Sequence, residues 1–266
     1  SAFTFLAFRM CQSCVAVAMV LSRAAVRDMY TADKAASMIG YVTMGMAVVP
    51  MIGPAIGGVL QEFYGWTSSF WMLFGFSGLI LWITFFDLGE TKSKSGKTLV
   101  GQFREYPELL TSPRFWGYTL SAALSSGTFF AYIGGAPFVG SEIFSLSARA
   151  LGFIISAPAL GYMIGNFLSG RYSATIGINR MIFAGCIISS LAPITALTTL
   201  AIGSSNPLAF FAPMVLVGLG NGLTIPNATA GALSVRPHLA GTASGLNGAL
   251  LIGIGAAVSA FAGTLL

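Results

Sequence analysis

Long runs of apolar residues, broken by short polar segments, dominate this sequence. A helix needs about 20 apolar residues to cross a bilayer, and eight stretches come close to or exceed that length. We predict membrane-spanning helices at residues 2–21, 38–60, 68–86, 115–139, 151–170, 181–202, 208–233 and 241–266. None of these runs alternates apolar with polar residues, as the strands of a membrane barrel do. The pattern therefore predicts an all-α polytopic membrane protein.

One connection, residues 87–114, is longer than the others and differs from the spans in composition. It contains a lysine- and serine-rich stretch, and apolar residues spaced for a short amphipathic helix on the membrane surface follow it. These apolar residues are Leu99, Val100, Phe103, Tyr106, Leu109 and Leu110. We therefore divide the chain into three spans at residues 1–86, a cytoplasmic central loop at 87–114, and five spans at 115–266.

The composition leads to the same class of protein. The chain is 55% hydrophobic and only 8% charged, whereas soluble domains carry about 25% charged residues. This excludes a soluble enzyme, a nucleic-acid-binding module and a disordered chain. Eleven of the 13 Lys and Arg residues lie in the connections after the first, third, fifth and seventh spans. By the positive-inside rule those connections face the cytoplasm, so we expect a multi-pass protein of the inner (cytoplasmic) membrane that binds no nucleic acid.

The sequence offers no group of residues for catalysis or metal binding. Cys11 and Cys14 have the C-x-x-C spacing of redox and metal sites, but they lie in an apolar span with no His nearby. We interpret both as small packing residues. We expect no cofactor, no metal and no catalytic residue, because no span holds the His, Asp, Glu or Ser groupings that an intramembrane enzyme needs.

Arg9 is the one charged residue well inside a predicted span. A guanidinium in hydrocarbon costs several kcal/mol, so its side chain is expected to face a cavity or a partner. Gln12 stands one turn further on and on the same helix face. The alternative is that Arg9 reaches back to the outer membrane surface along its flexible stem.

The second predicted span carries a run of glycines and prolines. These residues are Gly45, Pro50, Gly53, Pro54, Gly57 and Gly58. Proline bends a helix, and small residues four apart allow a neighbouring backbone to come close. We expect this run to form a gate by packing against the eighth span, which is itself rich in glycine.

These motifs resemble the major facilitator superfamily and, within it, the bicyclomycin/chloramphenicol-resistance (Bcr/CflA) drug–proton antiporters. Residues 53–58 resemble the antiporter signature of the fifth helix, and residues 8–12 resemble the fourth-helix motif of an Arg followed by a Gln. Residues 22–30 are similar to the segment that closes that helix. The resemblance implies a fold of two pseudo-symmetric six-helix halves, in which residues 1–266 correspond to helices four to eleven of twelve.

The resemblance also implies a function and a site. It implies proton-coupled efflux of a small-molecule drug or metabolite by alternating access, by a monomer in the lipid bilayer. The substrate site would lie between the halves, where Gln12 and four residues of the fourth and seventh spans are candidates. These four are Phe129, Tyr132, Asn221 and Asn227, and ordinary helix packing is the alternative for each of them. For Asn166 and Asn247 we expect interhelical hydrogen bonds.

No acidic residue lies deep inside a predicted span. A proton-coupled antiporter needs a protonatable carboxylate in its cavity, so we expect that group to come from sequence outside residues 1–266 and Arg9 to act on it. One alternative function is uptake of sugars or metabolites by a transporter of the same superfamily, against which the glycine–proline run argues. A membrane-embedded enzyme or receptor is a further alternative, and the missing catalytic groups argue against the enzyme.

Overall fold

The computed structural model describes residues 2–15, 52–88, 106–203 and 205–264, and also positions 18, 22, 25, 26, 29 and 49. Within these residues all regular structure is helical, which confirms the all-α fold class. In the part of the chain that the structure describes, six helical segments are long and apolar enough to cross a membrane. They are Thr67–Asp87, Pro113–Ile143, Ala148–Ile176, Ile178–Ala201, Pro207–Ser234 and Gly241–Gly263. Each overlaps one predicted span, from the third to the eighth.

The first two predicted spans lie partly outside the described residues. In the first, helix α1 (Ala2–Gln12) is followed by a single 3-10 turn, Ser13–Val15. In the second, residues 52–64 are helical and extend past the predicted end at residue 60. Gly45 and Pro50 of the glycine–proline run lie outside the described residues.

The chain forms two compact units. One consists of Ser1–Met46 and Leu73–Gly96, and the other of Ala47–Met72 and Lys97–Leu266. The first unit contains α1 and most of α4 (Thr67–Ile83), a helix with no buried residue and a continuous apolar surface, as expected for a helix in lipid. The predicted division of the chain at residues 87–114 stays a prediction.

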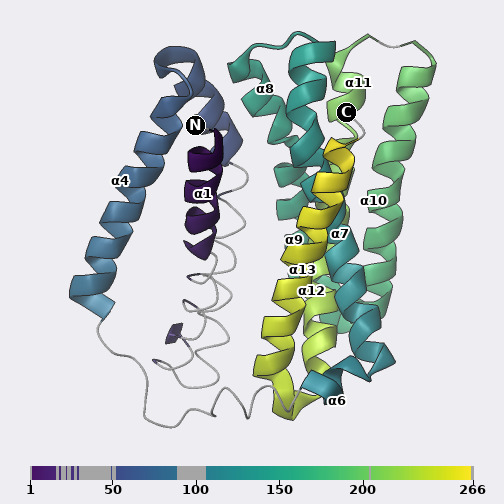
Figure 1. Cartoon of the computed structure of the whole chain (residues 1–266). Helices are drawn as coiled ribbons and strands as arrows, with labels where there is room; N and C mark the ends of the chain where they lie inside the picture. The colour runs from purple at the N-terminus through teal and green to yellow at the C-terminus, as the bar shows by residue number, and fades with distance from the viewer. Residues whose placement is uncertain are drawn as a thin grey trace. The chain divides into compact units, whose positions relative to one another are not determined.

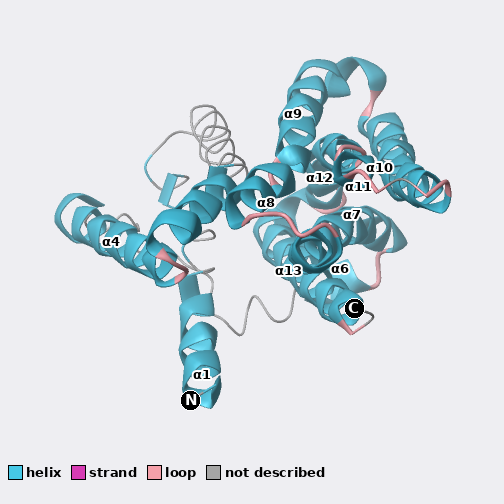
Figure 2. Cartoon of the chain, turned by 90° about the horizontal axis from the view of Figure 1, so that it is seen from above, coloured by secondary structure: helices cyan, strands magenta, loops and turns pink. Residues whose placement is uncertain are grey.

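The second unit is a bundle built around one central helix. Its elements after the central loop are α6 (Tyr106–Leu110), α7 (Pro113–Phe138), α8 (Ala148–Ile155), α9 (Ala157–Ile176), α10 (Ile178–Ala201), α11 (Pro207–Phe211), α12 (Met214–Ser234) and α13 (Ala240–Gly263). The long helices of this bundle run side by side (Figure 1). Seen end-on, α12 is flanked by α7, α9, α10 and α13, and it contacts all four (Figure 2).

Local sequence explains where several of these helices begin. Ser112 caps α7 by accepting a hydrogen bond from the backbone N–H of Phe115, and Pro113 occupies the first helical position. Ser147 caps α8 in the same way. Gly177 separates α9 from α10. Its φ of 90° is a backbone conformation that residues with a side chain rarely adopt.

Small residues bring the helices of the bundle into backbone contact. Gly161 and Gly165 of α9 lie directly against α12 at Gly218 and Gly222, and a Cβ added at any of the four would meet backbone atoms of the other helix. Van der Waals contact of this kind drives helix association in membranes, where lipid tails are as apolar as the side chains. These four glycines are therefore packing positions.

Helix α6 fixes the end of the central loop to the bundle. Leu109 is fully buried in a cluster with Phe115 of α7 and with Leu239 and Ala243 at the start of α13. Beside it, Glu108 forms an ion pair with Arg236, with Oε1 2.9 Å from Nε. The prediction of a short helix in this loop is confirmed for Tyr106–Leu110, and residues 99 to 105 lie outside the described residues.

Two of the predicted spans are interrupted. The fifth consists of α8 and α9, which meet at Ser156, and the seventh consists of α11 and α12, which meet at Ala212 and Pro213. Each pair still forms one membrane span, Ala148–Ile176 and Pro207–Ser234. Pro158 and Pro213 have no backbone N–H and clash with the preceding turn, which ends the helix before them.

Candidate functional site

Arg9 and Gln12 are joined on α1. Arg9 Nη1 donates a hydrogen bond to Gln12 Oε1 at 2.6 Å, and both side chains are exposed in the described structure. Residues three apart on a helix share a face, so this contact confirms that the two polar groups lie together. A charged donor strengthens the bond and orients the amide.

Asn221 lies in the core of the bundle and is 2% exposed. Its Oδ1 accepts a hydrogen bond from Ser125 Oγ of α7 at 2.6 Å and a longer one from Ser189 Oγ of α10 at 3.5 Å. The amide therefore links α12 to both neighbours. Ser125 and Ser189 are polar partners that the sequence analysis did not single out, although a serine within an apolar span was the available signal.

Asn227 makes the corresponding link between α12 and α9. It is 3% exposed, and its Nδ2 donates to Ser169 Oγ and to the carbonyl oxygen of Leu223, both at 2.8 Å. Buried polar groups in membranes need such partners. The structure thus shows a packing role for both asparagines, and their part in substrate binding stays a prediction.

Two other asparagines test the expected interhelical hydrogen bonds. Asn247 Nδ2 of α13 donates to Thr229 Oγ1 of α12 at 3.3 Å, which confirms the expectation for this residue. Asn166 Nδ2 instead donates to the carbonyl oxygen of Tyr162, one turn earlier in its own helix, at 2.8 Å. The expectation for Asn166 is wrong, because a carbonyl within the same helix lies within reach of the amide.

Tyr132 and Phe129 belong to the aromatic end of the bundle. Tyr132 is 7% exposed, and its ring packs edge-on against Phe211 with centroids 6.4 Å apart. Phe129 is half-buried against the same cluster. The Tyr132 hydroxyl donates toward the carbonyl oxygens of Ile154 and Ile155, each at 3.4 Å, at the point where α8 ends.

The glycine–proline run packs on α8, within the second compact unit. A Cβ added at Gly58 would lie 2.6 Å from the carbonyl oxygen of Ala148 and 3.2 Å from the Cα of Gly152. A Cβ added at Gly152 would meet the carbonyl oxygen of Pro54. Gly58 therefore packs against the fifth span. The prediction that it packs against the eighth span is wrong. Gly53 and Gly57 have no atom within 4 Å of an added Cβ among the described residues.

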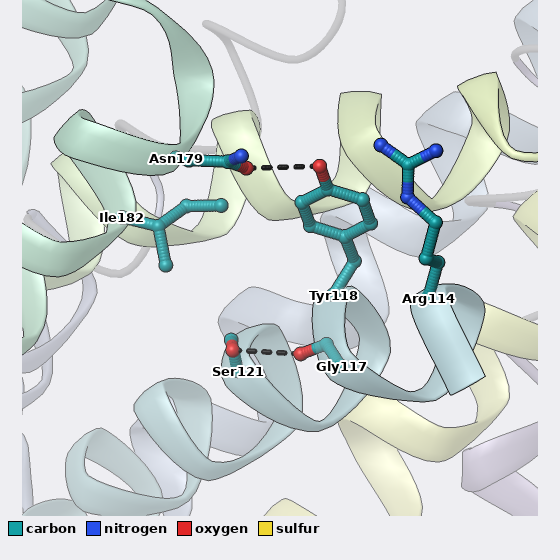
Figure 3. Close-up of a pocket in the computed structure, with 6 residues that line it drawn as sticks. All are labelled: Arg114, Gly117, Tyr118, Ser121, Asn179 and Ile182. Atoms are coloured by element: carbon teal, nitrogen blue, oxygen red, sulfur yellow. Dashed lines mark hydrogen bonds between the residues drawn. The ribbon is translucent and has the colours of Figure 1, made fainter.

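A separate pocket of about 300 Å³ lies at the other end of the bundle, between α7 and α10. In Figure 3, the Tyr118 hydroxyl points at Asn179 and donates to its Oδ1 at 2.9 Å, beside Arg114. Its volume is at the lower end for small-molecule sites. None of the residues predicted for substrate binding lines this pocket.

Comparison with known proteins assigns the chain to a family. The family model described as Major Facilitator Superfamily matches residues 1–260. The chain belongs to this superfamily. Its family and its helical fold are those of membrane transporters.

Relatives within the superfamily carry drug-resistance names. The chain is 27% identical to the bicyclomycin resistance protein homolog of Haemophilus influenzae, over 91% of the chain and 61% of that protein. It is 29% identical to the chloramphenicol resistance protein of Pseudomonas aeruginosa, over 96% of the chain and 62% of that protein. The resemblance to this group is confirmed. An uncharacterised transporter of Bacillus subtilis is 28% identical over 98% of the chain and 66% of its own length.

The chain therefore spans somewhat less than two thirds of the length of these curated relatives. Among solved structures, the inward-facing bacterial homolog of the human lysosomal transporter Spinster matches with a TM-score of 0.61. That match has 19% sequence identity and covers 90% of this chain and 57% of the other. It supports the superfamily fold.

Proposed function

We propose that the protein exports small organic molecules across the cytoplasmic membrane in exchange for protons, by alternating access. The observation that carries the proposal is the backbone contact between residues 54–58 and α8. In this contact the glycine–proline run, which resembles the antiporter signature, packs against α8. Close backbone packing of this kind can close one side of a transporter tightly. The names of the drug-resistance relatives support the same substrate class.

For contact with the substrate we propose Gln12 and Phe129. Arg9 and Gln12 expose a bonded polar pair on α1, and Phe129 is half-buried on α7. We assign proton coupling to Arg9, as the positive charge that acts on a protonatable carboxylate of the transport cavity. Tyr132, Asn221 and Asn227 support the site by holding the surrounding helices. We expect a monomer.

The experiment uses the protein expressed from its complete gene in inside-out membrane vesicles. The vesicle lumen, which corresponds to the outer side of the cell, is made acidic relative to the medium. The accumulation of labelled chloramphenicol in the lumen is then measured with and without a protonophore. Accumulation that the protonophore abolishes supports proton-driven export. Chloramphenicol movement that follows only its own gradient, or gradient-independent uptake of a sugar into right-side-out vesicles, would replace the proposal with the facilitator alternative.

A further inference from the structure

The break between α8 and α9 leaves two backbone carbonyls without their usual helical partners. In a continuous helix the carbonyl of Ile154 would accept from residue 158, but Pro158 has no N–H to donate. The carbonyl of Ile155 would accept from Ala159, whose N–H instead bonds to the carbonyl oxygen of Ser156 at 3.0 Å. The carbonyl of Ile154 receives instead the N–H of Ser156, two residues further on. A carbonyl that lacks its full helical hydrogen bond inside a membrane costs free energy, so a further donor stabilises this point.

That donor is the hydroxyl of Tyr132. It lies 3.4 Å from the carbonyl oxygens of both Ile154 and Ile155, so its single proton is shared between them. The Tyr132 ring is held by edge-on packing on Phe211, and this packing fixes the direction of the hydroxyl. Both distances are long for an O–H···O hydrogen bond, so each bond is weak and easily released.

On its other side, α8 is tied to residues 52–64. Gly152 lies against Pro54 and Gly58 with no room for a Cβ on either glycine. Helix α8 has only eight residues, Ala148–Ile155. By contrast, α9 is packed along α12 through Gly161 and Gly165. A short half-helix therefore sits between a firmly packed helix and the glycine–proline run.

We infer that Ser156 is a hinge, that α8 swings about it away from residues 52–64 when the outer side opens, and that Tyr132 is the positioning residue that holds the hinge closed. A packed helix bends sharply only where a proline or a similar break interrupts its hydrogen bonds. The break at Ser156 allows α8 to tilt while α9 keeps its contacts with α12. This inference rests on the proposed alternating access, and it assigns to Tyr132 a role distinct from contact with the substrate.

The test measures the hinge directly, in the whole protein after replacement of its cysteines by serine. Spin labels are attached at Arg149→Cys on α8 and Thr175→Cys near the end of α9, both at exposed positions. A straight helix would separate these residues by roughly 39 Å, from a rise of 1.5 Å per residue. Pulsed electron paramagnetic resonance then gives the distribution of distances between the two labels. If α8 adopts two orientations relative to α9, the distribution contains a second distance.

Tyr132→Phe keeps the ring and removes the shared hydrogen bond. We expect the population at the second distance, relative to the first, to rise by about two- to tenfold, as the loss of a weak hydrogen bond to part-buried carbonyls predicts. Tyr118→Phe is the matched control, because it removes a bonded hydroxyl at the opposite end of the same helix. It should leave the distribution unchanged. Equal distributions in both variants and the parent, or an equal change in both variants, would overturn the inference.

A second variant separates the hinge from the substrate site. Pro158→Ala restores an N–H for the carbonyl of Ile154, so we expect a narrower single distance, slower export and unchanged equilibrium binding of chloramphenicol. An unchanged distribution in this variant contradicts the hinge. If Tyr132→Phe weakens chloramphenicol binding without changing the distances, Tyr132 contacts substrate and the positioning role is wrong. Because the label distances need no transport, failure of the export assay does not affect this result.

Discussion

Addition of a single methyl group at Gly58 tests whether its contact with α8 closes the transporter. In Gly58→Ala the new Cβ would lie 2.6 Å from the carbonyl oxygen of Ala148 and 3.2 Å from the Cα of Gly152. Both obstacles are backbone atoms, which cannot turn away as a side chain can. Gly57→Ala is the matched control, since no atom lies within 4 Å of a Cβ at that position.

The expected size of the effect follows from this geometry. The distance of 2.6 Å is about 0.8 Å shorter than ordinary van der Waals contact, so α8 or residues 52–64 must move apart. Overpacking of this degree costs roughly 1–3 kcal/mol. Because the cost falls only on the state in which the two segments touch, it shifts the equilibrium toward the separated state by about 5–150-fold. Gly57→Ala should shift it by less than about twofold.

The assay measures the rate at which a membrane-impermeant thiol reagent labels Ala55→Cys from the outer side of intact cells. Ala55 is half-buried and lies one turn before Gly58 on the same helix face, so separation of the contact exposes it. We expect labelling to be at least about fivefold faster with Gly58→Ala than with Gly57→Ala, at equal amounts of inserted protein. Equal labelling rates in the two variants would refute the close-packing argument.

Three further predictions concern coupling, the buried amides and the central loop. Arg9→Ala should abolish drug-induced proton release by the purified protein while leaving equilibrium drug binding measurable, and normal release would remove the coupling role. Asn221→Ala should lower the unfolding free energy in detergent by about 1–3 kcal/mol, because it strands the buried Ser125 hydroxyl, and the loss should shrink when Ser125→Ala is added. Leu109→Ala should lower the unfolding free energy by about 2–5 kcal/mol, because the side chain is fully buried. Glu108→Gln should lower it by under about 1 kcal/mol, because its ion pair with Arg236 is half exposed. Equal losses of unfolding free energy in the two variants would contradict the burial argument.

The sequence by itself determined the membrane class and the positions of the six described spans. It could do so because both depend on local properties. A run of about 20 apolar residues crosses the bilayer wherever it occurs, and Ser112, Ser147 and Gly177 begin or end helices through contacts with residues a few positions away. The family resemblance rested on short motifs of the same local kind, and the match over residues 1–260 confirms it.

Part of the site was also visible in the sequence. The pairing of Arg9 with Gln12 follows from helical spacing, and the structure shows the hydrogen bond. Pro158 lies well inside an apolar run, but so do Pro137, Pro193 and Pro226, whose helices continue. Proline alone therefore did not locate the break in the fifth span. What proline predicts is the loss of a donor, and no sequence pattern indicates which side chain replaces it.

Only the tertiary structure decided which distant residues meet. It placed Gly58 against Gly152 rather than the eighth span, directed the amides of Asn221 and Asn227 to Ser125 and Ser169, and brought the Tyr132 hydroxyl to the carbonyls at the α8 break. Every predicted span contains glycine or serine, so many pairings satisfy the same periodicity. The choice among them depends on the crossing of whole helices, which the packing of the complete bundle sets and no single segment encodes.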